Sequence, residues 1–316
     1  MKNRADRRSR LKAVGWVLLA ALAAVAAWLV ARRGESWLQQ VSEHSWDPAW
    51  PALAASAVLL GLSLWLIPEG WVIICRALGG RDRRRLLRGA WFASQLGRYM
   101  PGKVWLFAGR AGFLRARGMG MARAASAPVA ELLFTAAAAG LASLAGLLLR
   151  GGRMPDGLLA ALVGASALAL VLPFLRPLQR LALRLRGKGP AAPLDIGAAG
   201  GVRLIGIYAG LWALRAAALL LWLRGFGLKD IGYLACLAGV PLSWLAGYLA
   251  FFVPGGIGVR EAALVAILAG SGDTGPLLLA VGGHRILLSL GELLFGLLSF
   301  GTFRRVSGSA ERKAEE

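Results

Sequence analysis

The chain has 316 residues, of which 57% are hydrophobic and 17% are charged, and its formal net charge is +21. The length would suit two soluble domains, but this apolar content argues against an ordinary soluble protein. A strong positive charge is also typical of nucleic-acid-binding proteins. Here, however, the basic residues fall in short clusters between apolar runs, where lipid headgroups and membrane orientation account for them. We therefore expect no nucleic-acid partner.

Apolar runs of about 20 residues, the length that crosses ~30 Å of hydrocarbon, recur along the chain. We expect six full spans, at 13–31, 51–75, 124–149, 157–175, 202–223 and 277–303. The first run follows a basic segment and ends without a small-residue cleavage site, which favours a retained helix over a signal peptide. The resulting prediction is an all-α polytopic membrane protein with a basic N-terminus (1–12), one transmembrane domain (13–303) and a short tail (304–316).

The basic clusters also predict orientation, because loops rich in arginine and lysine stay in the cytoplasm. The positive-inside rule places both termini on the cytoplasmic side and leaves few basic residues on the other. Within one inner loop, residues 177–186 put leucines on one face and arginines on the other, which predicts a helix lying on the membrane surface.

Two segments interrupt this pattern of spans. Residues 89–109 are apolar but have basic clusters on both flanks, and residues 231–275 start and finish on the opposite side. A segment that begins and ends on one side is a re-entrant hairpin, so we expect two oppositely oriented hairpins and a pseudo-inverted repeat. Whether 231–253 crosses fully is left open. The breaks are at Pro101-Gly102-Lys103, just after Arg98, and at Pro254-Gly255-Gly256.

Ionisable side chains inside the apolar segments each cost about 2.5–3.5 kcal/mol at the bilayer centre, so each needs a partner or a wet cavity. The candidates are Arg110, Glu131, Arg215, Arg260, Glu261, Arg285 and Glu292. The last two are seven residues apart and are expected on one helix face. Together with the residues at the two breaks they form the candidate substrate-binding set. Structural ion pairs between helices remain an alternative.

Other reactive residue types suggest no chemistry. His284 is expected to be a packing residue with its hydrogen bonds satisfied. The sequence has no nucleophile–base arrangement, nucleotide-binding loop or metal-ligand spacing, so we expect no catalytic residue, metal or cofactor.

The two breaks also carry a family resemblance. At 95–103, followed by Gly109-Arg110, and at 252–261, the sequence resembles the lysylphosphatidylglycerol synthase transmembrane-region family of flippase-like membrane proteins. Arg285 resembles the late arginine of that family. Met100 and Lys103 depart from the family's usual, less cationic setting, so the headgroup preference is expected to be this chain's own.

The resemblance implies a helical protein of the bacterial inner membrane that handles phospholipid or polyprenyl-phosphate lipids. Larger relatives carry a soluble aminoacyl-transferase domain, and we expect this chain to correspond to the membrane half alone. The leading expectation is therefore a flippase for lipids with anionic headgroups. Alternatives are a membrane enzyme or an accessory protein in lipid-linked glycan or aminoacyl-lipid pathways, and a homo-oligomer or a partner enzyme stays open.

Overall fold

The computed structural model describes residues 32, 34–99, 104–151, 196–250, 253–268 and 274–315, which form helices and turns with no strand among them. Four helices in this part of the chain are long and apolar enough to cross a membrane. They are α2 (Trp50–Ala77), α5 (Met121–Leu149), α8 (Gly197–Gly225) and the first part of α11 (Thr274–Glu315), namely Thr274–Ser299. For the described residues the prediction of an all-helical fold is confirmed, and four of these helices are candidates for membrane spans.

These four helices coincide with the runs predicted at 51–75, 124–149, 202–223 and 277–303, with ends that differ by a few residues. α11 continues without interruption to Glu315, so the segment predicted as a tail at 304–316 is helical up to that residue. The tail contains no proline, and alanine, arginine, glutamate and lysine, which dominate its end, are good helix formers. Four predicted segments lie outside the described residues: 1–12, 13–31, 157–175 and 177–186.

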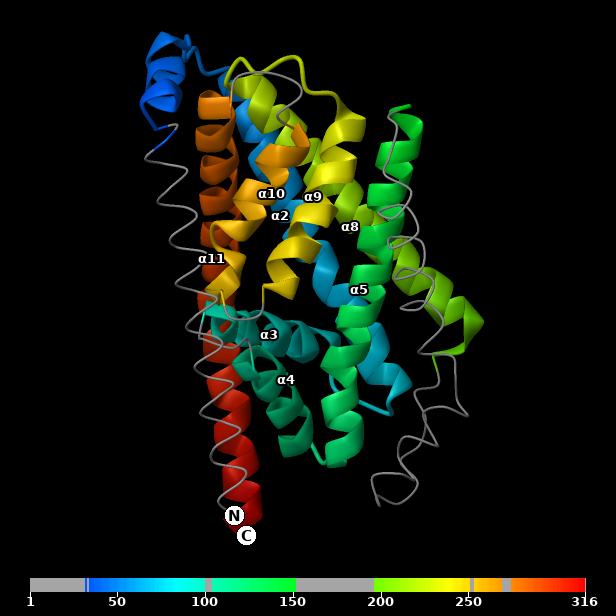
Figure 1. The fold of residues 1–316 in the computed structure, drawn as a ribbon. Coiled ribbons are helices and arrows are strands. Elements are labelled where there is room, and N and C mark those ends of the chain that lie inside the picture. The colour runs from blue at the N-terminus through cyan, green and yellow to red at the C-terminus, as the bar shows by residue number, and fades with distance from the viewer. Residues whose placement is uncertain are drawn as a thin grey trace, which may run out of the picture.

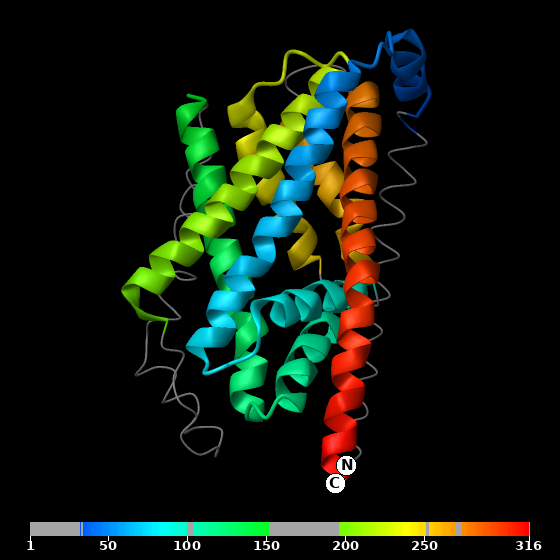
Figure 2. The same cartoon turned by 180° about the vertical axis from the view of Figure 1, so that it is seen from behind.

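Small residues let the long helices approach closely. α2 and α8 pack against each other along much of their length, as Figure 2 shows from behind. At Gly70 of α2, a Cβ atom would lie 2.2 Å from the Tyr208 hydroxyl oxygen of α8. At Gly146 of α5, it would lie 2.5 Å from the backbone nitrogen of Ala238 in α9 (Tyr233–Leu249). Close approach through small residues is how membrane helices gain packing contacts.

The first interrupted segment consists of α3 (Arg84–Gln95), the short 3₁₀ helix η1 (Leu96–Tyr99) and α4 (Val104–Ala116). A break was predicted here, but the helices reach beyond 89–109 at both ends. α3 is amphipathic, with Leu87 and Trp91 buried and Arg85 exposed. Because its first residues are basic, the apolar run that defined the predicted segment did not include them. Residues 100–103, which include the predicted Pro101-Gly102-Lys103, lie outside the described residues.

The second interrupted segment consists of α9 (Tyr233–Leu249), η3 (Pro254–Gly256) and α10 (Val259–Leu268), and α9 and α10 pack against each other. α9 is shorter than the four long helices and ends at Leu249. Gly255, Gly256 and Gly258 have φ values of 61°, 70° and 82°, a left-handed conformation that only glycine adopts without strain. In Figure 1, α9 and α10 come from one end of the bundle and α3 and α4 lie toward the other, and η1 contacts η3 between them.

Candidate functional site

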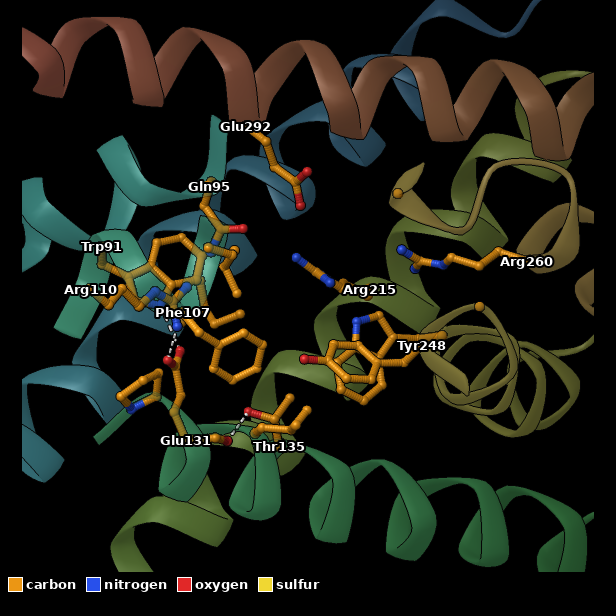
Figure 3. Close-up of a pocket in the computed structure, with 17 residues that line it drawn as sticks. Trp91, Gln95, Phe107, Arg110, Glu131, Thr135, Arg215, Tyr248, Arg260 and Glu292 are labelled. Carbon is orange, nitrogen blue, oxygen red and sulfur yellow. Dashed lines mark hydrogen bonds and ion pairs between the residues drawn. The ribbon is translucent and has the colours of Figure 1, made fainter. Parts of the chain in front are cut away.

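A cavity of about 100 Å³ lies where the two interrupted segments meet the long helices. Its polar lining residues come from six helices: Gln95, Arg110, Glu131, Thr135, Arg215, Arg260 and Glu292. Figure 3 shows these side chains converging on one space, with Trp91, Phe107 and Tyr248 completing its walls. Because one water molecule needs about 10–15 Å³ of such cavity volume, the cavity has room for several waters or a small polar headgroup.

Two arginines project into this cavity from different helices (Figure 3). Arg215 lies near the middle of α8 and is 5% exposed, and its Nε donates to the Ser63 hydroxyl at 3.4 Å. Its guanidinium carbon is 5.7 Å from the centroid of the Trp212 ring. Arg260 is the second residue of α10, directly after the break, and is 8% exposed. The second break therefore places the Arg260 guanidinium group in the same cavity that Arg215 enters from the middle of α8.

A third arginine is held in a buried ion pair. Arg110 of α4 pairs with Glu131 of α5, and each residue is 4% exposed. The second carboxylate oxygen of Glu131 accepts a hydrogen bond from the Trp91 indole at 2.6 Å, and Arg110 Nε donates to the Ser94 hydroxyl at 2.9 Å. The pair connects α4, α5 and α3 and neutralises its own charges. Arg110 and Glu131 thus form an ion pair between helices while both line the cavity.

The cavity has an excess of positive charge. Its described lining contains three arginines and two glutamates, which leaves a net formal charge of +1. Glu292 of α11 supplies the second carboxylate, which approaches the space from the side opposite α5 (Figure 3). After the Arg110–Glu131 pair is set aside, Arg215, Arg260 and Glu292 still sum to +1. A cavity with this charge in low-dielectric surroundings favours an anion over a cation.

Glu261 and Arg285 stabilise the second break. The Gly258 backbone N–H donates to Glu261 Oε2 at 2.7 Å, which is the glutamate half of a capping box at the start of α10. Arg285 Nη2 donates to the Gly255 carbonyl at 3.0 Å, and its Nε lies 3.6 Å from Glu261 Oε1. Irregular backbone inside a membrane needs such internal partners. These two residues line a second, smaller cavity beside the first.

The structure thus brings together six of the predicted site residues around the larger cavity: Arg110, Glu131, Arg215, Gly255, Arg260 and Glu292. Gly256 is buried next to them. Arg98 lies in η1 and Pro254 in η3, and their side chains are outside the described part of the structure, as are Pro101, Gly102 and Lys103 entirely. Arg285 and Glu292 share α11, as expected, but line different cavities.

Several lining residues were not predicted, notably Trp91, Gln95, Thr135, Trp244 and Tyr248. One local signal was available for two of them. Trp244 and Tyr248 are four residues apart just before the second break, which puts them on one helix face, and their ring centroids are 5.2 Å apart. Nothing in the sequence around Trp91 or Thr135 distinguished them from core residues.

Within the described residues, no group of three or more histidine, cysteine, aspartate or glutamate side chains is placed to hold a metal ion. No protein-family model matches the chain, and no curated protein matches it.

Proposed function

We propose that this protein moves a lipid with an anionic phosphate headgroup, an anionic phospholipid or a polyprenyl-phosphate lipid, between the leaflets of a bacterial inner membrane. The observation that carries the proposal is the pair of arginines, Arg215 and Arg260, both buried and both directed into one cavity whose lining has a net charge of +1. Arginine binds phosphate through two parallel N–H groups, and a phosphodiester carries one negative charge. Charge and donor geometry therefore both suit a lipid phosphate.

The proposed topology has six full spans, two of them outside the described residues, with both termini in the cytoplasm. In this proposal α3–α4 and α9–α10 are re-entrant hairpins from opposite faces of the membrane, related as an inverted pair. Transporters place their substrate at mid-depth between such broken helices. The contact between η1 and η3 next to the cavity supports this arrangement. The motif resemblance to the lysylphosphatidylglycerol synthase transmembrane-region family supports the same substrate class.

Transport is a better proposal than sugar transfer because of how Glu131 is held. A catalytic carboxylate must accept or donate a proton at the reacting atom. Both oxygens of Glu131 already accept hydrogen bonds, one from Trp91 and one from Arg110. We therefore propose a binding and translocating protein without a cofactor, whose partners are the membrane lipids themselves.

Reconstitution tests this proposal. The purified protein in liposomes with a fluorescent phosphatidylglycerol or polyprenyl phosphate should make the inner-leaflet probe accessible to an external quencher faster than protein-free liposomes do. Because each arginine gives charge-assisted hydrogen bonds of about 1.5–3 kcal/mol, Arg215→Gln and Arg260→Gln should slow exchange about tenfold or more. Arg150→Gln, an exposed arginine after α5, is the matched control and should retain the rate.

Equal rates in protein-containing and protein-free liposomes for both lipid classes would refute the proposal. Equal rates in the wild type and in both cavity variants would refute the assignment of the site. Thermal unfolding of each variant separates loss of transport from loss of the folded protein.

A further inference from the structure

A second cavity of about 40 Å³ lies between α2, α8, α9, α10 and α11, next to the larger one. Arg215 and Arg260 line both cavities. The other polar residues of the smaller cavity are Ser243, Glu261, His284 and Arg285. The rest of its described lining is leucine and valine, which makes it a small polar space with an apolar surround.

His284 supplies an unsatisfied polar atom in this cavity. The residue is 8% exposed, and its ring packs against Trp222 with a centroid distance of 6.0 Å. The expected packing role is therefore correct. Its Nε2 atom, however, is buried and has no hydrogen-bond partner among the described residues, contrary to the expectation of a satisfied histidine. A buried polar atom without a partner lowers the stability of the folded protein by about 1–3 kcal/mol. A water or an ion bound at His284 Nε2 would remove this cost.

The charges around His284 select an anion. Arg215 and Arg260 line the cavity from α8 and α10, and so do Arg285 of α11 and Glu261 of α10, which form an ion pair with each other at 3.6 Å. Three arginines and one glutamate leave a net formal charge of +2 with His284 neutral. Counted over both cavities together, four arginines and three glutamates leave +1. One monovalent anion would neutralise the described ionised groups that line the two spaces.

The size of the cavity restricts which anion can enter. At about 10–15 Å³ per water, 40 Å³ corresponds to roughly three waters. A halide ion fits this space, whereas an esterified phosphate with its glycerol or isoprenoid attached does not. The larger cavity next to it is the one with room for a headgroup.

We propose that the smaller cavity is a binding site for a small inorganic monoanion of the chloride type. The His284 ring donates an Nε2–H hydrogen bond to the ion, and Arg215, Arg260 and Arg285 supply the compensating charge. The site does not depend on lipid transport. When the larger cavity holds no phosphate, the anion bound in the smaller cavity is the counter-ion of Arg215 and Arg260, which line both cavities.

Equilibrium binding of radiolabelled chloride to the full-length protein tests this site. The protein is placed in nanodiscs of zwitterionic phosphatidylcholine, which contain no anionic lipid, and ionic strength is held constant with sodium gluconate. We expect saturable binding of one chloride per chain. Bromide should displace the label more strongly than inorganic phosphate does at the same concentration, because phosphate is too large for this cavity and competes only through the arginines shared with the larger one. Adding phosphatidylglycerol to the discs should weaken chloride binding through the shared arginines.

Two variants and one control locate the ion. His284→Phe removes the donor and should weaken chloride binding about tenfold or more, the loss that a hydrogen bond to a charged group implies. Val281→Leu keeps every polar residue but fills part of the cavity, and it should weaken binding as well. His44→Phe replaces the other histidine, whose Nε2 is 2.8 Å from the Phe226 carbonyl oxygen and which does not line the cavity, and it should bind chloride as the wild type does.

Absence of saturable chloride binding would overturn the proposal, as would binding that is equal in the wild type, His284→Phe and Val281→Leu. If His284→Phe does not fold, Val281→Leu decides the matter alone. Displacement by phosphate but not by bromide would assign the ion to the larger cavity and would likewise refute the smaller site. Because the chloride-binding measurement in phosphatidylcholine discs contains no transported lipid, a negative result there is distinct from a failure of the transport assay.

Discussion

The side chain of Arg260 crosses α9 at Gly247, where a Cβ atom would lie 2.1 Å from Arg260 Cγ and 2.7 Å from its Cδ. Such distances are far inside van der Waals contact, so only glycine allows the arginine to pass. The same glycine lies against the break, because a Cβ on Gly256 would be 2.9 Å from the Gly247 carbonyl oxygen. The position of the Arg260 guanidinium therefore depends on a residue of another helix that carries no charge.

Gly247→Ala should displace Arg260 from the cavity and slow lipid exchange about tenfold or more, as Arg260→Gln does. Gly61→Ala in α2 is the matched control, because a Cβ there meets no atom within 4 Å. Alanine at an open helix position should leave the free energy of unfolding unchanged or raise it by up to about 1 kcal/mol. Exchange rates and thermal unfolding of both variants check this. Equal exchange rates in the two variants would contradict the dependence of Arg260 on Gly247.

The glycines of the second break predict a graded loss of stability. Gly256 and Gly258 both have positive φ, which costs a residue with a Cβ about 1–2 kcal/mol. A Cβ on Gly258 meets no atom within 4 Å, whereas one on Gly256 also meets the Gly247 backbone. Gly256→Ala should therefore lower the melting temperature more than Gly258→Ala does. Thermal unfolding in the same detergent measures the order: equal losses would show that strain alone governs this turn, and a larger loss for Gly258→Ala would contradict the prediction.

The Arg110–Glu131 pair should behave as a buried structural ion pair. Glu131→Gln removes one charge and leaves the Arg110 guanidinium uncompensated, which should cost about 3 kcal/mol or more of stability. The double variant Arg110→Met with Glu131→Leu should lose less, because no charge is then left buried. Asp82→Asn, which disrupts the more exposed pair with Arg117, should cost about 1 kcal/mol or less. Unfolding titrations of these three variants and the wild type provide the comparison, and a double variant that loses as much stability as Glu131→Gln would contradict the pairing.

The proposed hairpin of α3 and α4 makes a topological prediction. Arg81 and Ala116 are exposed and flank this segment, and Asp230 is exposed before α9. Because the native Cys75 and Cys236 are buried, they should give little background labelling. In inverted and right-side-out vesicles, Arg81→Cys and Ala116→Cys should react from the cytoplasmic side and Asp230→Cys from the opposite side. Labelling of positions 81 and 116 from different sides would exclude the hairpin.

Much of this architecture follows from local sequence. The apolar runs that became α2, α5, α8 and α11 were recognisable because a membrane-spanning helix must satisfy its own backbone and face hydrocarbon. The break at Pro254-Gly255-Gly256 was recognisable for a similar reason, since proline removes a donor and glycine alone tolerates the left-handed conformation. The true extent of the first broken segment was missed, because its amphipathic start at Arg84 does not resemble an apolar run.

The sequence by itself therefore determined the helices, the second break and the short list of charges inside the apolar segments, because each depends on neighbouring residues. Only the tertiary structure decided how those charges are shared. It paired Arg110 with Glu131, directed Arg215 and Arg260 into one cavity, and placed His284 in another. The partners come from different helices far apart in the chain, so their distances depend on helix packing, which no local pattern of residues specifies.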